Sequence, residues 1–165
     1  MAAVMCVMSP WSINVGPIPL SLATLALYII ASLCSPKTTV AATAVYISLG
    51  AVGLPVFSSF TGGFEKIAGV TGGYIIGYLP CAFIISMILY KHSNKWLYPA
   101  AMMAGTAVLY LFGTVWFCYA TGTGFIKALS VCVLPFLIGD GIKIAAASIL
   151  GWLLRPRLAA VSKAG

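Results

Sequence analysis

The chain has 165 residues, of which 62% are hydrophobic and only 7% are charged, and its formal net charge is +7. Because soluble domains carry about 25% charged residues, this composition excludes an ordinary water-soluble protein and predicts that apolar surface faces lipid. The basic residues lie singly at the ends of apolar runs, whereas nucleic-acid-binding proteins gather them on one stripe or face. The length predicts a single domain, residues 1–165.

Apolar runs separated by polar, glycine or proline breaks predict an all-α membrane protein, a compact bundle of six transmembrane helices. The first run, residues 1–12, is too short for a hydrocarbon core of about 30 Å, so part of the natural N-terminus is expected to be missing. A short loop, 13–19, follows it. The later spans are predicted at 20–35, 38–54, 72–90, 97–120 and 135–154, with a short helix at 125–133 before the last span.

A structured outer segment, 55–71, is expected between spans three and four. It is rich in glycine, serine and threonine. Irregular backbone at membrane depth persists only where it is buried in protein or lines a cavity. We therefore expect this segment to cap a pocket, although an ordinary exposed loop is the alternative. The predicted aromatic walls of that pocket are Phe57, Phe60, Phe64 and Tyr74.

The positions of the basic residues predict the orientation in the membrane. If six spans begin in the cytoplasm, six basic residues lie in inner segments and two in outer segments. This bias agrees with the positive-inside rule, so we expect a multi-pass protein of the cell (cytoplasmic) membrane with both termini in the cytoplasm. The inner residues are Lys37, Lys91, Lys95, Arg155, Arg157 and Lys163, and the outer residues are Lys66 and Lys127.

Small residues recur at four-residue spacing in the last three predicted spans. Such spacing allows two helix backbones to approach closely in lipid, where packing drives association. The pattern supports a compact bundle and carries no functional information. The pairs are Gly73 with Gly77, Ala101 with Gly105, and Ala147 with Gly151.

Two opposite charges, Asp140 and Lys143, interrupt the last apolar run. A charged side chain at mid-bilayer costs about 2.5–3.5 kcal/mol on insertion scales, and such residues usually mark a substrate or ion site. Their i, i+3 spacing puts both on one helix face. We expect them to address a polar ligand in the outer half of the span, where Gly139 and Gly141 permit close approach. The alternative is an ion pair that only satisfies itself.

Other classes of protein find little support in the sequence. No nucleophile–base set is evident, the five cysteines form no Cys-x-x-Cys pair, and the single histidine, His92, falls in a predicted polar loop. We therefore predict no enzymatic activity, no metal and no cofactor. The chain also lacks a nucleotide-binding GxxxxGK[ST] loop. A membrane enzyme and a channel or structural subunit are kept as alternatives.

Four ordered motifs resemble those of a known family. They are VGPIPLSL from Val15, LGAVGLPVF from Leu49, GVTGGYIIG from Gly69 and LPFLIGDGIK from Leu134. Together, over nearly the whole chain, they resemble BioY, the biotin-specific S component of energy-coupling factor (ECF) transporters. Two positions depart from the pattern. Val70 stands where the family usually has proline in GPTGGY, and Ala23 stands where it usually has glutamine in TLQTL.

The resemblance implies high-affinity capture of biotin from the outer face and its uptake by an ECF-type ABC transporter. This chain would be the substrate-binding subunit, with a transmembrane coupling subunit and two ATPase subunits as partners. It also implies that small residues of the first helix, among them Ala2, Ala3 and Cys6, dock on the coupling subunit. An S component for a different vitamin is the alternative within the same class.

The resulting hypothesis for the site combines the motifs. Asp140 accepts hydrogen bonds from ligand N–H groups such as those of the ureido ring, and Lys143 donates to a ligand carbonyl or carboxylate. The end of biotin that meets Lys143 is left open. Residues 71–74 are expected to supply backbone donors, a hydroxyl and an aromatic wall, and the segments 55–71 and 13–19 are expected to cover the ligand. The predicted ligand-binding residues are Asp140, Lys143, Thr71, Gly72, Gly73, Tyr74 and Phe57.

Overall fold

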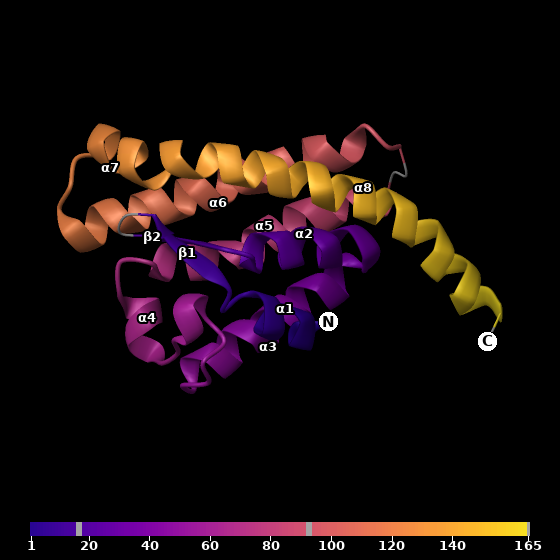
Figure 1. Cartoon of the computed structure of the whole chain (residues 1–165), viewed down its shortest axis with the longest axis horizontal. Coiled ribbons are helices and arrows are strands. Elements are labelled where there is room, and N and C mark those ends of the chain that lie inside the picture. The colour runs from indigo at the N-terminus through magenta and orange to yellow at the C-terminus, as the bar shows by residue number, and fades with distance from the viewer. Residues whose placement is uncertain (16–17, 92–93, 165) are drawn as a thin grey trace.

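The computed structural model describes residues 1–15, 18–91 and 94–164, and most of these residues are helical. The main helices run along the long axis of the molecule, and a small β-hairpin lies toward the end that also carries α4 and α7 (Figure 1). The elements are α1 (Ala2–Met8), β1 (Ser12–Val15), β2 (Ile18–Ser21), α2 (Ala23–Leu33), α3 (Pro36–Ala51), the 3-10 turn η1 (Ser58–Phe60), α4 (Phe64–Ala68), α5 (Gly72–Lys91), α6 (Leu97–Thr121), α7 (Phe125–Cys132) and α8 (Leu134–Ala164).

Within the described ranges, three helices are long and apolar enough to cross a membrane: Gly72–Lys91, Leu97–Thr121 and Leu134–Pro156. The helices of the N-terminal half are shorter, with 11 residues in α2 and 16 residues in α3. At 1.5 Å per residue α2 extends about 16 Å, which is roughly half of the hydrocarbon core. Length and composition therefore identify a membrane protein but do not confirm the predicted count of six spans.

A β-hairpin occupies the region predicted as a loop over 13–19 and as the start of span two. Its strands pair in antiparallel register from Ser12↔Ser21 to Val15↔Ile18, and α2 begins only at Ala23. The β-branched residues of this segment favour strands, and Pro19 disfavours helical backbone at the residue before it. The prediction read the apolar residues after Pro19 as helix and missed this local preference.

Helix ends in the C-terminal half lie close to the predicted ones, with one exception. The helix α6 ends at Thr121 and is capped by Gly122, which has φ +67° and donates its backbone N–H to the carbonyl of Cys118. The exception is α8, which was predicted to end at residue 154 and continues through Pro156 to Ala164. A proline inside a helix removes one hydrogen bond and bends the helix without necessarily ending it. Figure 1 shows the last part of α8 turning away from the bundle.

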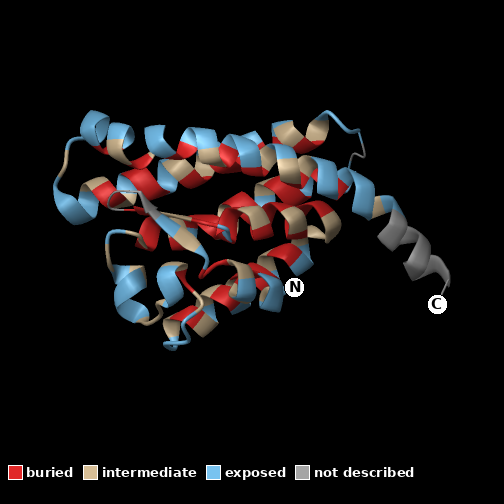
Figure 2. Ribbon diagram, in the orientation of Figure 1, coloured by how far each residue is buried: buried red, intermediate tan, exposed pale blue. Residues whose placement is uncertain are grey.

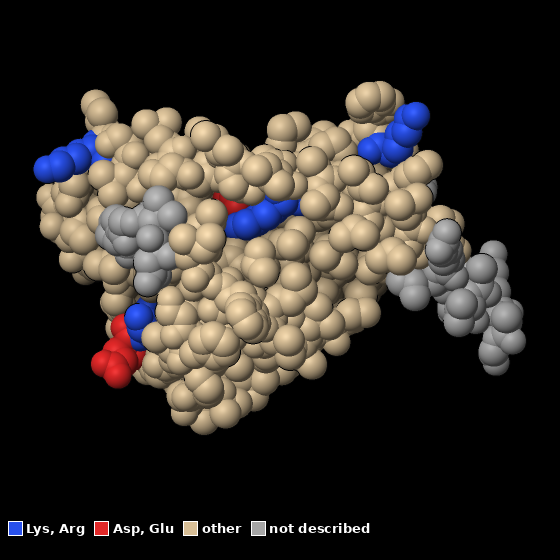
Figure 3. All heavy atoms as spheres, viewed as in Figure 1, with Lys and Arg blue, Asp and Glu red and all other residues tan. Residues whose placement is uncertain are grey.

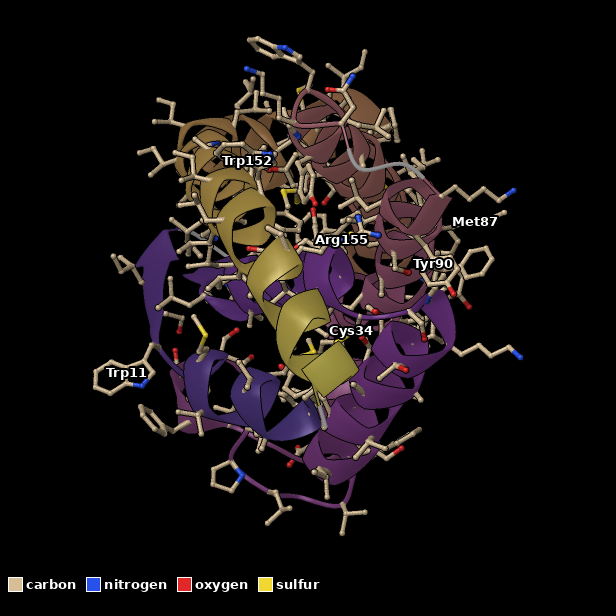
Figure 4. The ribbon with its side chains drawn as sticks, turned by 90° about the vertical axis from the view of Figure 1, so that its right-hand side faces the viewer. Trp11, Cys34, Met87, Tyr90, Trp152 and Arg155 are labelled. Carbon is tan, nitrogen blue, oxygen red and sulfur yellow. The ribbon has the colours of Figure 1, made fainter. Side chains whose placement is uncertain are left out.

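Arg155 ties α8 to the end of α5. Its Nη1 atom donates to the carbonyl of Leu89 at 2.6 Å and its Nη2 atom to that of Tyr90 at 3.5 Å. The last carbonyls of a helix lack partners within the helix, and a cation is favourable there. In Figure 4, which views this end, the Arg155 side chain points toward Tyr90. The contact fixes the two helices relative to each other at the end opposite the hairpin.

The small-residue pattern is confirmed as close helix packing. A Cβ atom added at Gly73 would lie 2.2 Å from the Cβ of Trp116, and one added at Gly77 would lie 3.0 Å from Leu109, so α5 and α6 meet at their backbones. A Cβ added at Gly105 would meet Ile85 at 2.5 Å. The other close-packed small residues are Ala101, Ala147 and Gly151.

The burial of side chains follows the expectation for a lipid-facing bundle. Buried residues lie where the helices face one another, and exposed ones line the outside (Figure 2). On α8, Ile138 is 78% exposed and Ile142 is 68% exposed, whereas Asp140 is 5% and Lys143 is 8% exposed. The helix therefore turns apolar side chains outward and its charges inward. Figure 3 shows a largely uncharged face with charged groups at its ends and an opposite-charge pair near the middle.

Candidate ligand-binding site

A cavity of about 800 Å³ lies between the hairpin, the loop after α3 and the helices α5, α6 and α8. Its volume falls within the usual range for small-molecule sites, about 300–1,000 Å³. About half of its lining residues are aromatic or aliphatic, and its charged residues are Asp140 and Lys143 of α8 and Glu65 and Lys66 of α4. The aromatic residues that line it are Tyr46, Phe57, Tyr74, Tyr78, Tyr110 and Phe136.

Asp140 and Lys143 form an ion pair at the cavity wall. The Nζ atom of Lys143 lies 3.0 Å from Oδ1 of Asp140, and both residues line the cavity. The predicted placement of the two charges on one buried helix face is confirmed. Gly139 is the point where Leu20 of β2 approaches α8, because a Cβ atom added there would lie 3.0 Å from the leucine side chain. Gly141 has nothing within 4 Å and plays no such part.

Lys143 uses all of its hydrogen-bonding capacity within the protein. Besides Asp140, its ammonium donates to the backbone carbonyl of Ser21 at 2.7 Å and to Oγ1 of Thr24 at 3.0 Å. An ammonium has three N–H donors, so these three acceptors satisfy it. Lys143 thereby connects α8 to the end of β2 and to the first turn of α2.

Asp140 is held from two other helices. Its Oδ2 atom accepts from the hydroxyl of Tyr110 on α6 at 2.5 Å, and Oδ1 also accepts from Thr24 of α2 at 3.5 Å. A carboxylate has about four acceptor positions, so it retains room for a further donor from the cavity. Tyr110 and Thr24 were not predicted, because nothing in the spacing of either residue distinguishes it from its apolar neighbours. The departure at Ala23 lies directly beside Thr24.

The predicted residues Thr71 and Tyr74 both line the cavity. The hydroxyl of Tyr74 donates to the carbonyl of Cys132 at 3.2 Å, and the tyrosine ring lies over Gly113, where an added Cβ would be 2.3 Å away. The hydroxyl of Thr71 donates to the carbonyl of Lys66 at 3.4 Å. Both hydroxyls therefore have partners within the protein, and the two residues form part of the cavity wall.

Two of the backbone N–H groups expected as ligand donors at 71–74 already have acceptors within the protein. The N–H of Gly72 donates to the carbonyl of Gly69 at 3.0 Å, and that of Tyr74 donates to the carbonyl of Thr71 at 3.1 Å. Gly72 and Gly73 are absent from the described lining of the cavity. Both are buried where α5 packs on neighbouring backbone and on Trp116, so their small size serves helix packing.

Phe57 is a wall of the cavity, as predicted. It is 3% exposed, its ring lies 5.7 Å from that of Tyr46, and it fills the space that a side chain on Gly50 would need. Phe60 and Phe64, which were predicted as further walls, are 60% and 71% exposed and are absent from the described lining of the cavity.

The local turn explains why Phe60 points outward. Ser59 and Phe60 both have positive φ values, 61° and 55°, which turn the chain sharply after Phe57. The ring of Phe60 then meets that of Trp11 edge-on, with centroids 6.0 Å apart, and Ser59 N–H donates to the carbonyl of Pro10 at 3.0 Å. Figure 4 shows Trp11 pointing away from the bundle. The loop after α3 is therefore fastened to the segment that begins the hairpin.

The described residues contain no cluster of side chains suited to binding a metal ion. Within the ranges 1–15, 18–91 and 94–164, no group of three or more His, Cys, Asp or Glu side chains could hold a metal ion. His92, which was predicted to lie in a polar loop, falls outside the described residues.

Comparison with known proteins gives a consistent result. The model of the BioY family matches residues 1–160. The biotin transporter BioY of Thermotoga maritima is 34% identical over 150 residues, which cover 90% of this chain and 88% of that protein. The probable biotin transporter BioY of Pyrococcus horikoshii is 37% identical over 139 residues, covering 84% and 82%. The biotin transporter BioY2 of Lactococcus lactis subsp. cremoris is 31% identical over 164 residues, covering 98% and 90%.

A solved structure shares the fold. It is the crystal structure of the S component for biotin from an ECF-type ABC transporter, and it superposes with a TM-score of 0.87. The sequence identity is 24%, and the match covers 94% of this chain and 86% of that chain. The arrangement of helices and hairpin described above is thus the fold of that structure.

Proposed function

The chain belongs to the BioY family, and we propose that it captures biotin from the outer face of the membrane with high affinity. In this role it is the substrate-binding S component of an ECF-type ABC transporter. The named relatives are transporters and not enzymes. The observation that carries the proposal is the buried Asp140–Lys143 pair, which lines a cavity of about 800 Å³ inside an apolar bundle.

We propose six passes through the membrane with both termini in the cytoplasm. The turn between α2 and α3, the connection between α5 and α6 and the C-terminal end of α8 lie at one end of the molecule, and α4 and α7 lie at the other (Figure 1). The first end carries Lys37, Lys91, Lys95 and Arg155, which supports a cytoplasmic location for it. The helices α1 and α2 are too short to cross the membrane alone, and in this proposal the hairpin between them supplies the rest of each pass.

At the site, Asp140 is the group best suited to receive ligand N–H donors. It lines the cavity and keeps acceptor capacity beyond its bonds to Lys143, Thr24 and Tyr110. Lys143 differs, because its three donors already have acceptors. A ligand carbonyl or carboxylate that binds Lys143 must therefore replace one of those acceptors. The apolar part of biotin would lie against aromatic walls such as Phe57.

The transmembrane coupling subunit and two ATPase subunits of an ECF module are the proposed partners. Ala3 is exposed, and Ala2 and Cys6 are partly exposed on α1, which supports a contact with another membrane subunit through small side chains. Co-purification with an ECF module tests this part. A bulky replacement such as Ala3→Trp should reduce co-purification and leave biotin binding unchanged.

A binding panel tests the proposed substrate and separates it from the alternative vitamin. The protein purified in detergent is titrated by calorimetry with biotin and, separately, with thiamine, riboflavin and pantothenate. We expect saturable binding of biotin at one site per chain and none of the others. Binding of another vitamin in preference to biotin would move the protein to a different S-component class.

A further inference from the structure

We infer that Tyr110 is a positioning residue for the ligand, which acts by fixing the Oδ2 atom of Asp140. This inference rests on the proposed function and names a residue that determines specificity at the same site. The observation that supports it is that the two carboxylate oxygens accept different numbers of hydrogen bonds, two at Oδ1 and one at Oδ2. Oδ1 accepts from Lys143 at 3.0 Å and from Thr24 at 3.5 Å, whereas Oδ2 accepts from Tyr110 at 2.5 Å.

The rotation of the carboxylate is the property that Tyr110 controls. The last torsion of an aspartate is broad, so contacts to Oδ1 alone leave the plane of the carboxylate poorly defined. Tyr110 approaches from α6, while Lys143 lies on α8 with Asp140 and Thr24 lies on α2. A third helix thus fixes the second oxygen, and the free acceptor direction of Asp140 is held toward the cavity.

The single proton of Tyr110 makes this edge of the cavity selective. A phenol has one O–H donor, and Tyr110 gives it to Asp140, so its oxygen meets a ligand only as an acceptor. Asp140 and Tyr110 then present acceptors side by side on the cavity wall. Such an edge favours ligand N–H donors. It disfavours a ligand carboxylate, because the ligand oxygens and the protein oxygens are then both acceptors and remain buried without hydrogen bonds.

Another buried tyrosine of the bundle provides a matched control. The hydroxyl of Tyr28 pairs with Oγ1 of Thr106 at 2.5 Å, the same length as the bond from Tyr110 to Asp140. Tyr28 is fully buried and lies outside the described lining of the cavity. Replacing either tyrosine by phenylalanine removes one buried hydroxyl, but only Tyr110→Phe removes a partner of Asp140.

The test compares biotin affinity of the two variants in the full chain. Tyr110→Phe should weaken binding roughly ten- to hundredfold, the usual effect of a hydrogen bond to a charged group, and Tyr28→Phe should change it by less than about threefold. In an Asp140→Asn background, Tyr110→Phe should cause a clearly smaller loss than in the parent, because its main effect acts through the carboxylate. Unchanged binding by Tyr110→Phe, or an equal loss in both backgrounds, would overturn the inference.

An infrared measurement keeps the test independent of affinity. The difference between spectra of the parent and Asp140→Asn isolates the carboxylate band of Asp140. That band should shift in Tyr110→Phe and stay in place in Tyr28→Phe, and a band that does not move with Tyr110 contradicts the inference. If the parent protein binds no biotin, the proposed function fails, whereas the infrared result still decides whether Tyr110 fixes Asp140.

Discussion

The ammonium of Lys143 donates to the backbone carbonyl of Ser21 at 2.7 Å, so the charged centre on α8 is bonded directly to the last residue of the β-hairpin. The hairpin forms part of the cavity wall through Ile18, Pro19 and Leu20. The polar centre and one of the segments that enclose the cavity are thus a connected unit. A ligand that accepts a hydrogen bond from Lys143 in place of Ser21 would therefore break the bond between α8 and the hairpin.

Removal of the negative charge tests the role of Asp140. Asp140→Asn keeps the size of the side chain but leaves Lys143 without its ionic partner, so biotin binding should weaken by about 2–5 kcal/mol, as for other buried charge pairs that lose one member. Lys37→Gln is the control, since it also removes one charge, and Lys37 is exposed and lies outside the described lining of the cavity. Calorimetric titration of both variants checks the difference, and equal affinities would contradict it.

Removal of the positive charge tests the ion pair itself. Lys143→Met leaves Asp140 as a buried charge without its cation, and such a change typically costs about 3–5 kcal/mol of stability. The thermal unfolding temperature in detergent should fall clearly. Adding Asp140→Asn to Lys143→Met should recover part of the loss, because no uncompensated charge then remains. A double variant less stable than Lys143→Met would refute this account of the pair.

Helix packing at Gly73 predicts a contrast with Gly141. Gly73→Ala places a methyl group 2.2 Å from the Cβ of Trp116 and should force α5 and α6 apart, with a destabilisation of about 1–3 kcal/mol or more. Gly141→Ala meets open space within α8 and should be neutral or stabilising by up to about 1 kcal/mol. Unfolding temperatures of the two variants provide the comparison; similar values would argue against close packing at Gly73.

The two phenylalanines of the loop after α3 should behave differently. Phe57→Ala removes a buried ring from between Gly50 and Tyr46 and should cost about 3–5 kcal/mol of stability, with weaker biotin binding. Phe60→Ala removes a ring that is 60% exposed and should alter both properties little. Thermal unfolding and biotin titration of the pair test the assignment, which fails if Phe60→Ala is the more damaging change.

Local patterns in the sequence predicted the features that depend on neighbouring residues. The helices α5 and α6 follow from long apolar runs, and the proximity of Asp140 to Lys143 follows from a spacing of three residues on one helix. The same reasoning found Phe57 and Tyr74 on the cavity wall. In each case the information lies within one element or in its composition.

Features that depend on distant residues could not be predicted in this way. Tyr110 is 30 positions and Thr24 is 116 positions from Asp140, and only the packing of three helices brings them together. The outward direction of Phe60 depends on the positive φ at Ser59, which the residue types do not reveal. The role of Gly73 in packing was visible in the spacing, but the resemblance favoured a ligand contact there.

The most direct test of the central claim is an experimental structure of the protein with biotin bound. We predict that biotin occupies the cavity lined by Asp140, Lys143 and Phe57, with a ureido N–H within hydrogen-bonding distance of a carboxylate oxygen of Asp140. Biotin bound at another place, with the Asp140–Lys143 pair remote from it, would contradict the account and leave the fold alone standing.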